Sequence, residues 1–364
     1  MAERIVVAMS GGVDSSVAAA RLVDQGFEVI GVTLHLWDQP QGSARGRCCA
    51  PEDVHDARRV ADRLGIPHYS LDRRSEFLER VVLPFARAYA RGQTPSPCTV
   101  CNQLVKMPLL ARMAELMGAG KIATGHFARV VAHDGGWRIA RGRDRHKDQS
   151  YYLYALGAAV LERLVLVLGD DTKECVRAEA LRRGLAGAGK GESQDLCFVP
   201  SGSYHEVVER FAASDLRPGL VIDSQGQALA RHGGVHRFTV GQRKGLRVGA
   251  GPARFVTAID ADRAAVMVGP QESLLVRRLC IARPTIAHAV RLPARATVQI
   301  RYRHEGEPAW LRGCEQALVV EFDAPVRAAT VGQVAVAYDG DQVLAGGEIT
   351  AVGPEGCAEA HLVG

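Results

Sequence analysis

The sequence of 364 residues has no run of about 18 consecutive apolar residues, so we expect no helix that spans a membrane. Its first residues, MAERIVVAMS, lead directly into a strand-like run and do not fit a secretory signal. There is no internal repeat and no low-complexity segment. The formal charge of +5 is mild, although the 45 Lys and Arg residues, mostly Arg, are compatible with a nucleic-acid partner. These features favour a cytoplasmic globular protein with reduced thiols, and the length predicts two or three domains.

A glycine-containing loop near the start lacks two common signatures. No Gly-Lys-Ser/Thr follows it, which excludes a Walker loop, and it is not the G-x-G-x-x-G of a Rossmann fold. The loop, AMSGGVDSS at residues 8–16, lies between an apolar run and an alanine-rich stretch, so we predict strand, loop and helix. Gly11 and Gly12 let the backbone come close to a ligand, and the loop N–H groups favour an anion. Asp14 repels bare phosphate but suits a phosphate that carries Mg²⁺.

Strand-like and helix-like segments alternate over the first 125 residues, which predicts an α/β fold with a parallel sheet. Helical spacing of apolar residues covers 51–64, and two further helical stretches cover 75–91 and 104–117. Ligands of such sheets bind at the carboxyl ends of the strands. We therefore expect the glycine loop, the strand end near Leu34 and the turn at Gly125 to lie at one edge of the sheet.

The pattern changes after about residue 200, where short β-like runs replace helical spacing, with Gly and Pro between them. We predict an N-terminal catalytic domain with a parallel sheet at 1–199, a small mixed central domain at 200–276 and a C-terminal β-barrel at 277–364.

Two segments contain the most informative cysteines: TPSPCTVCN at 94–102 and SQDLCF at 193–198. The prolines stiffen the first segment and fix where its thiols point. Its CxxC is compatible with zinc, an iron–sulfur ligand pair, a redox pair or inert core thiols. Structural zinc needs four ligands, and a thioredoxin-like pair would open a helix after the first strand. The residues alone leave these alternatives open.

The motifs SGGVDS, TPSPCTVCN, ATGHFAR, RDRHKDQSYYLY, SQDLCFVP and FTVGQRKGL occur in that order. The first resembles the pyrophosphate loop (PP-loop) of the ATP pyrophosphatase superfamily. The series resembles the bacterial tRNA-specific 2-thiouridylases over almost the whole chain. The resemblance implies a sulfurtransferase in which ATP adenylates the C2 oxygen of the wobble uridine of tRNA and pyrophosphate leaves. A sulfur nucleophile then displaces AMP to give 2-thiouridine.

The resemblance also implies roles for individual residues. Cys101 matches the catalytic cysteine, and Cys197 matches the cysteine that accepts persulfide sulfur from a relay protein. The expected ATP contacts are Ala8, Met9, Ser10, Gly11, Gly12, Val13, Asp14, Ser15, Leu34 and Gly125. The expected tRNA contacts are Ser96, Pro97, Cys98, His126, Lys147, Asp148, Gln149, Arg301, Tyr302 and Gln333. No role follows for the basic pair in GQRKGL at 241–246.

Cys98 departs from the pattern, because many relatives have Asp at this position. With Cys98, Cys101 and Cys197 the site has three thiols, which could hold a [4Fe–4S] cluster with one open iron. The competing hypothesis, which we favour, is a persulfide at Cys197 that Cys101 attacks, leaving a disulfide.

Two other functions are open alternatives. A ligase or amidotransferase of the same superfamily would adenylate a small molecule and would need neither the cysteines nor the barrel. A nucleic-acid-binding or sulfur-carrier protein without catalysis would have a degenerate loop, whereas the loop at residues 8–16 is intact.

Overall fold

The predicted strands at the start of the chain form one parallel sheet. Its order is β3-β2-β1-β4-β7, so the first strand of the chain lies in the middle. Apolar composition explains this position, because the three central residues of β1 are fully buried. The strands are β1 Arg4–Ala8, β2 Glu28–His35, β3 His68–Asp72, β4 Lys121–Ala123 and β7 Leu164–Val165.

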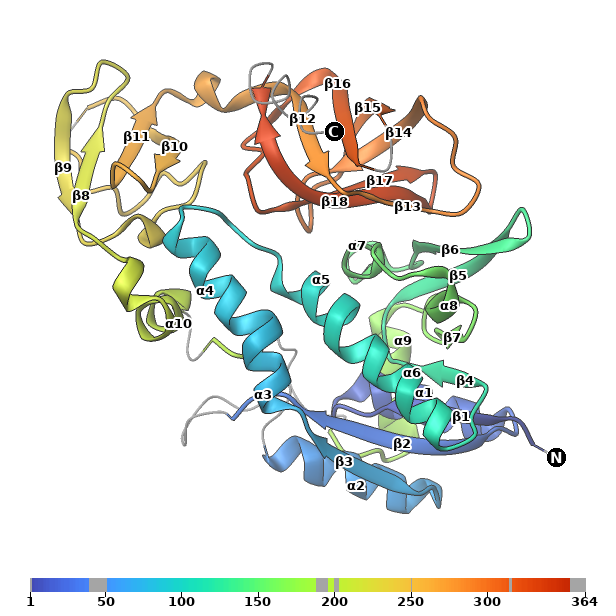
Figure 1. The fold of residues 1–364 in the computed structure, drawn as a ribbon. Helices are drawn as coiled ribbons and strands as arrows, with labels where there is room; N and C mark the ends of the chain where they lie inside the picture. Colours follow the sequence, from blue (N-terminus) through green and yellow to red (C-terminus); the bar gives the residue numbers. More distant parts are fainter. Residues whose placement is uncertain are drawn as a thin grey trace. The chain divides into compact units, whose positions relative to one another are not determined.

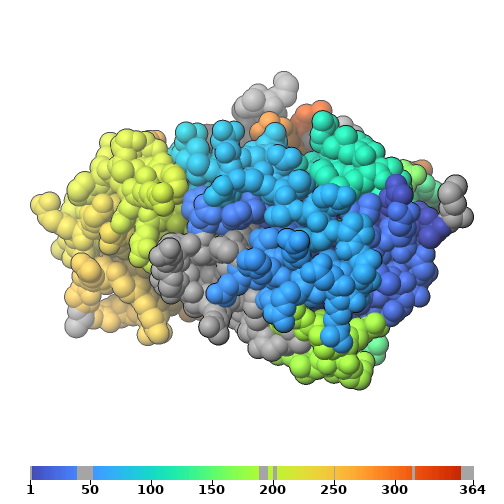
Figure 2. Space-filling model, turned by 90° about the horizontal axis from the view of Figure 1, so that it is seen from below, coloured from blue at the N-terminus to red at the C-terminus, as the bar shows by residue number. Residues whose placement is uncertain are grey.

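Helices cover both faces of this sheet (Figure 1). α1, α2 and α9 share one core, in which Val17, Ala57 and Val176 are fully buried. Figure 2 looks onto this layer and shows α2 in blue beside α9 in yellow-green. α6 contacts β1 and β4 on the other face. The bounds are α1 Val13–Asp24, α2 Pro51–Leu64, α6 Met107–Leu116 and α9 Lys173–Arg182.

Short segments fill the connections of the sheet. The two stretches predicted as helical, 75–91 and 104–117, are helical, but each overlaps a π-helical turn. Apolar spacing does not distinguish one helical pitch from another. Between β3 and α6 the elements are α3 Arg74–Phe77, π-helix η1 Leu78–Val82, α4 Leu83–Ala90, α5 Pro97–Cys101 and π-helix η2 Asn102–Lys106. Between β4 and β7 they are β5 Ala128–His133, β6 Gly136–Arg141, α7 Ser150–Leu153 and α8 Ala158–Leu161.

The structure is a computed structural model that describes residues 2–38, 51–187, 196–199, 203–249, 251–313 and 316–353. The chain groups into two units. The first comprises Met1–Val82, Pro97–Gly202 and Asp341–Val343, and the second Leu83–Ser96, Ser203–Gly340 and Leu344–Gly364. Residues 83–96 therefore group with the C-terminal part, and α4 packs against α10, Tyr204–Phe211.

The second unit contains two β-structures. A four-stranded sheet has the order β10-β11-β8-β9. The strands β12, β16, β15, β14, β17 and β18 form a barrel, which the pairing of β12 with β18 closes. The sheet strands are β8 Gly219–Ile222, β9 Ala228–His232, β10 Phe255–Asp260 and β11 Ala265–Gly269. The barrel strands are β12 Leu275–Ala282, β14 Ala294–Gln299, β15 Glu307–Gly313, β16 Ala317–Arg327, β17 Val334–Asp339 and β18 Gln342–Val352.

The remaining elements are short. They are the 3₁₀ turns η3 Ala213–Asp215, η4 Val235–Arg237 and η5 Gln271–Leu274, and the strand β13 Thr285–Ile286. The predicted fold class, a parallel α/β sheet followed by a mixed module and a β-barrel, is confirmed. Within the ranges that the structure describes, no helix is long and apolar enough to cross a membrane.

Three histidines of the second unit, His205, His232 and His236, lie around the contact of α10 with η4. His236 is 1% exposed, and its Nε2 lies 3.2 Å from Oε1 of Glu209. The ring of His205 lies edge-on to that of His236. Burial lowers the pKa of all three histidines below the ordinary value, and at His236 it outweighs the opposing effect of Glu209.

These histidines make the stability of the second unit depend on pH. Their pKa values in the folded state lie below the unfolded value of about 6.5, so the unfolded chain binds more protons as the pH falls through that value. The free energy of unfolding should therefore decrease below about pH 6.5, by at most about 1.4 kcal/mol per pH unit for each histidine. Urea unfolding at a series of pH values measures this slope. His236→Gln should flatten it, with His55→Gln at an exposed position of α2 as control, and an unchanged slope in His236→Gln would contradict the assignment.

Candidate functional site

The glycine loop connects the end of β1 to the start of α1. Ser15 fixes its shape, because the hydroxyl accepts the Ser10 N–H at 3.1 Å and donates to the Gly12 carbonyl at 3.1 Å. Gly11 has a φ of 73°, and a Cβ there would lie 2.2 Å from the carbonyl oxygen of Asp53, so only glycine fits. No side chain caps the start of α1. The first N–H groups of the helix therefore point into the loop and favour an anion.

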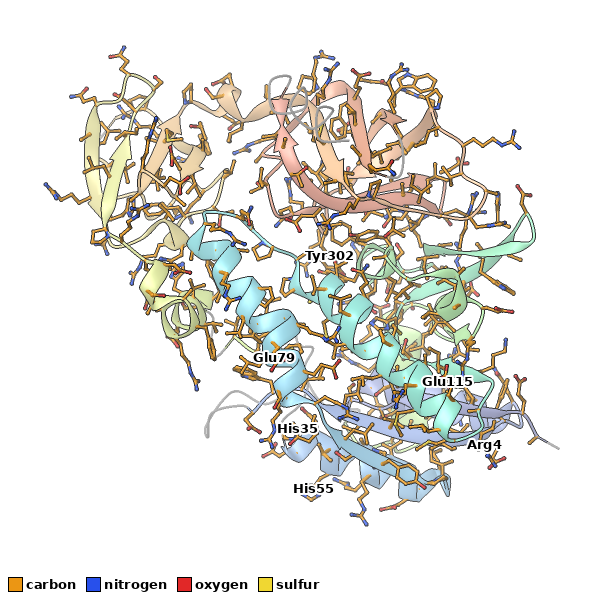
Figure 3. All side chains as sticks on the ribbon, viewed as in Figure 1. Arg4, His35, His55, Glu79, Glu115 and Tyr302 are labelled. Atoms are coloured by element: carbon orange, nitrogen blue, oxygen red, sulfur yellow. The ribbon has the colours of Figure 1, made fainter. Side chains whose placement is uncertain are left out.

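The loop, the end of β2 and the end of β4 lie at one edge of the sheet. A Cβ on Gly125, which follows β4, would lie 2.6 Å from the backbone nitrogen of Ser15. The Gly125 backbone therefore lies directly against the first turn of α1. Leu34 is near the end of β2, and in Figure 3 the next residue, His35, marks this edge while Arg4 marks the opposite one. The structure thus brings the expected ATP contacts to a single edge.

Lys173 adds a buried cation that the sequence motifs did not indicate. It begins α9, is 8% exposed, and its Nζ lies 2.5 Å from Oδ1 of Asp14. Its ammonium also lies 5.7 Å from the centre of the Phe127 ring. A lysine in the first turn of a helix opposes the helix dipole. This unfavourable position is the one sequence signal that could have marked Lys173.

α5 places Cys98 and Cys101 three positions apart, and therefore on one face of the helix. Cys101 is 5% exposed, Cys98 is half-buried, and both are thiols. The chain continues into the π-helix η2, where Asn102 donates from Nδ2 to the carbonyl of Tyr152 at 3.3 Å. This bond ties the helix that carries the thiols to α7. π-helical turns are frequent at functional sites.

Cys197 lies in a short segment that an aromatic side chain anchors. Phe198 is 2% exposed, and its ring centre lies 5.8 Å from that of Phe77 and 6.3 Å from that of Trp37. Trp37 follows β2 and Phe77 ends α3, so the anchor lies beyond the carboxyl end of β2. Cys197 itself is a half-buried thiol.

A metal cluster needs ligands that converge on one volume. Among the residues that the structure describes, no group of three or more His, Cys, Asp or Glu side chains could hold a metal ion. This result concerns a single ion, so the [4Fe–4S] cluster at Cys98, Cys101 and Cys197 stays a prediction, and no step of the mechanism below depends on it. Cys101 and Cys197 are both thiols, which is the state before the disulfide that is expected to remain after sulfur transfer.

The segment around Lys147, expected to contact tRNA, is shaped by a buried carboxylate. Asp148 is 5% exposed, and its Oδ1 accepts the N–H groups of Gly142 and Ser150, both at 3.0 Å. Its Oδ2 lies 3.3 Å from the Arg141 guanidinium. These bonds fix the segment from within. Asp148 therefore holds the conformation of the loop, and we do not expect it to reach a phosphate itself.

The other residues of this segment divide into an inner and an outer set. Gln149 belongs to the inner set, because its Oε1 accepts the Phe127 N–H at 2.9 Å. Arg143, Arg145 and His146 are exposed. Arg145 forms an ion pair with Asp341, whereas Arg143 donates to the Asp170 carbonyl at 3.5 Å. The solvent face of the segment therefore includes exposed arginines, which suit contact with phosphate.

His126 follows Gly125 and is half-buried. Its Nδ1 lies 2.7 Å from Oγ1 of Thr124. Burial and, secondarily, the positive charge of Lys106 lower the pKa of His126 to about 3. The imidazole is therefore neutral at physiological pH, so it would meet RNA as a hydrogen-bonding group and not as a cation.

Several expected tRNA contacts lie in the second unit. Arg301 and Tyr302 occupy the turn between β14 and β15, where Arg301 is exposed and Tyr302 half-buried. Gln333 directly precedes β17. Ser96 is the last residue of a second-unit segment, and Pro97 begins the next segment of the first unit.

The chain is similar to known proteins over most of its length. Family models described as tRNA methyl transferase HUP domain, tRNA methyl transferase PRC-barrel domain and aminomethyltransferase beta-barrel domain match residues 3–201, 206–270 and 273–349. A protein named tRNA-specific 2-thiouridylase MnmA from Sorangium cellulosum is 54% identical over 356 residues, which are 96% of this chain and 92% of the relative. A protein of the same name from Syntrophotalea carbinolica is 45% identical over 350 residues, 95% of this chain and 98% of the relative.

One solved structure, a 4-thiouridine synthetase–RNA complex with bound ATP, is 18% identical and covers 58% of this chain and 50% of its own. Its TM-score is 0.35.

Gly125→Ala tests the close approach of the Gly125 backbone to the first turn of α1. The new Cβ would lie 2.6 Å from the Ser15 nitrogen and 2.7 Å from the Asp14 carbonyl carbon, which are backbone atoms and cannot swing away. We expect the free energy of unfolding to fall by about 1–3 kcal/mol. ATP binding, measured by calorimetry, should weaken about tenfold or more, because a shift of about 1 Å misplaces the phosphate donors.

The matched control is Gly120→Ala, just before β4. A Cβ there meets only the side chain of Glu3, at 3.5 Å, so stability and ATP binding should stay as in the parent protein. Equal losses of stability and of ATP binding in both variants would contradict the role assigned to the close approach of Gly125 to α1.

Proposed function

This chain belongs to the tRNA-specific 2-thiouridylase family, and from that membership we propose that it is a tRNA-uridine 2-sulfurtransferase that uses ATP to thiolate the wobble uridine at C2. The observation that carries the proposal is the combination found in the first unit. That unit holds both an uncapped helix start behind a glycine loop and the thiols of Cys98, Cys101 and Cys197.

The first step is adenylation. The C2 carbonyl oxygen of uridine attacks the α-phosphorus of ATP, the bond to the β-phosphate oxygen breaks, and pyrophosphate leaves. Loop residues 8–15 would bind the phosphates through N–H groups, while Leu34 and Gly125 would contact the remainder of the nucleotide. Adenylation is needed because a carbonyl oxygen is a poor leaving group and AMP is a good one.

The second step transfers sulfur. The outer sulfur of a persulfide on Cys197 attacks C2 of the adenylated uridine, and AMP leaves. The thiolate of Cys101 then attacks the Cys197 sulfur, and the sulfur–sulfur bond breaks towards the nucleotide. The products are 2-thiouridine and a Cys101–Cys197 disulfide, which a thiol reductant returns to two thiols. A persulfide relay protein would load Cys197 for each cycle.

Asp14 is the loop carboxylate that fits an Mg²⁺ ion, which binds one or two carboxylates together with phosphate oxygens. In the structure Lys173 neutralises this carboxylate. We propose that the two exchange partners when MgATP binds, so that Asp14 faces the metal and the Lys173 ammonium binds a phosphate oxygen. Lys173 would then stabilise the charge that builds up on pyrophosphate as it leaves.

The tRNA substrate would be held through phosphate contacts at the cationic face around Arg143, Arg145 and Lys147. The wobble uridine leaves its stack to reach the reacting groups, and Tyr302 offers a ring on which a base can stack. We propose that the protein acts in the cytoplasm, where such a substrate is found.

The description of the matching family models mentions methyl transfer. Methyl transfer has no use for an ATP-splitting loop or for a persulfide, so the glycine loop and the thiols favour thiolation. An assay with ATP and a sulfur source but no methyl donor separates the two reactions.

Cys101→Ser should separate adenylation from sulfur transfer. With ATP, Mg²⁺, a persulfide source and unmodified tRNA, the parent protein should release pyrophosphate and incorporate sulfur into the wobble uridine. The variant should still release pyrophosphate but form at least about 100-fold less 2-thiouridine, because the Cys197 adduct is not resolved. A reductant-sensitive tRNA–protein adduct should appear on a non-reducing gel.

Cys175→Ser is the matched control, because Cys175 is an exposed thiol of α9. It should keep both activities. Normal 2-thiouridine formation by Cys101→Ser under single-turnover conditions would overturn the assignment of Cys101.

Lys173→Met should impair adenylation while keeping the volume of the side chain. The lost charge-assisted bond is worth about 1.5–3 kcal/mol, so the rate of pyrophosphate release at subsaturating ATP should fall about 10- to 100-fold. Lys121→Met is the control. It removes a lysine whose Nζ donates to the Glu162 carbonyl at 3.1 Å, and it should leave the rate of pyrophosphate release unchanged. If Lys173→Met releases pyrophosphate normally, the exchange of partners does not occur.

A further inference from the structure

The segment Gly241–Arg247, which we call the basic turn, is a feature that the mechanism above leaves unused. It contains the motif GQRKGL followed by an arginine, and it lies between η4 and β10 in the second unit. Its cationic side chains are Arg243, Lys244 and Arg247.

The backbone of the basic turn is held at its start. The Gly241 N–H donates to the Val256 carbonyl at 2.8 Å, and the Val256 N–H donates to the Gln242 carbonyl at 2.9 Å. The Gln242 side chain adds two more bonds, since its Oε1 accepts the Thr239 N–H at 3.0 Å and its Nε2 donates to the Lys244 carbonyl at 2.9 Å. Side-chain and backbone bonds together fix the shape of the turn.

The end of the basic turn is held by burial. Leu246 is 4% exposed and packs in the core of the four-stranded sheet with Phe238 and Val256. The next residue, Arg247, has a φ of 54°, in the left-handed region that side chains other than glycine rarely adopt. Such strain persists where the surrounding structure imposes it, often at functional sites.

The fixed backbone carries exposed charge. Arg243, Lys244 and Arg247 are all exposed, and none of them forms an ion pair with a carboxylate among the described residues. Other arginines of the unit are neutralised, as Arg295 is by Asp323 at 2.6 Å. The basic turn is therefore a local concentration of positive charge on a rigid support, which is suited to binding an anion with more than one phosphate.

The basic turn lies next to the part of the barrel that carries an expected tRNA contact. A Cβ on Gly241 would lie 3.0 Å from that of Ala328, so the two backbones approach closely. The neighbouring Arg327 places its guanidinium 5.0 Å from the ring centre of Phe255, the first residue of β10. The Arg327 carbonyl accepts a hydrogen bond from Nη1 of Arg301 at 3.3 Å. The turn and Arg301 are thus joined through Arg327 and Ala328.

We propose that the basic turn binds the sugar–phosphate backbone of the tRNA substrate and positions it for Arg301 and Tyr302. This inference rests on the proposed function for the identity of the RNA. Guanidinium and ammonium groups at fixed positions bind phosphates irrespective of base sequence, so the turn sets the register of the RNA and does not read bases. An acidic protein partner is the competing occupant, and continuity with Arg301 favours the RNA.

The test compares two double variants that each remove two positive charges. Arg243→Ala/Lys244→Ala removes charge from the basic turn. Arg231→Ala/Arg263→Ala removes charge from β9 and from the β10–β11 turn, which the strand register places at the other end of the same sheet. Direct binding of labelled tRNA without ATP is measured over a range of salt concentrations, so the result does not depend on whether thiolation occurs.

For the basic-turn variant we expect binding to weaken about tenfold near 0.1 M salt, and the slope of log K against log salt to become less steep by about 2. The control should change both quantities little. Equal changes in the two variants would overturn the proposal, because they would show an effect of net charge alone. Unchanged tRNA binding, with sulfur transfer lost only from a protein persulfide donor, would also overturn it and would identify an acidic protein as the occupant.

Gln242→Ala tests the hydrogen bonds that hold the basic turn while leaving its charged side chains unchanged. This variant keeps every cation but removes the bonds to Thr239 and Lys244. We expect tRNA binding to weaken severalfold with an almost unchanged salt slope, because the number of phosphates contacted is the same while the turn is less ordered. Binding as tight as in the parent protein would overturn the positioning role of Gln242.

Discussion

The backbone of Gly125 lies against the first turn of α1, and the arrangement of the site depends on this approach. It holds the end of β4 beside the glycine loop, so that two strand ends and a helix start face one volume. Only a residue without a side chain permits it. The same volume receives the Lys173 ammonium from α9, which supplies positive charge near the helix start without occupying its N–H groups. The site is therefore built by backbone atoms first and by side chains second.

The two thiols Cys101 and Cys197 are supported by different contacts. Cys101 is carried by α5, which the bond from Asn102 ties to α7. Cys197 depends on the burial of Phe198 between Trp37 and Phe77. In the proposed mechanism, activation of the nucleotide and delivery of sulfur therefore use different parts of one unit. This separation suits a reaction in which the leaving group is installed before sulfur is delivered.

Much of this arrangement could be predicted from the sequence, because its determinants are local. Parallel strands end at one edge, so the neighbourhood of the glycine loop, Leu34 and Gly125 follows from the order of strands and helices. Lys173 could not be found in this way, since its partner Asp14 lies 159 positions earlier in the chain and no periodicity links them. The motif around Asp148 indicated a tRNA contact, but only the structure shows that this carboxylate is turned inward to hold its own loop. Apolar spacing likewise located the helices and not their π-helical turns.

The grouping of residues 83–96 with the C-terminal part has a consequence for dissecting the gene. A fragment that ends at residue 199 contains the whole parallel sheet, yet it would deprive α4 of α10, the helix against which it packs. Phe85 and Tyr89 are buried in the intact chain. In the fragment these side chains would become exposed to solvent, so the fragment should aggregate. The part with the PP-loop and the thiols is consequently not a removable module. Fusion proteins and split versions of this enzyme need their junctions placed elsewhere.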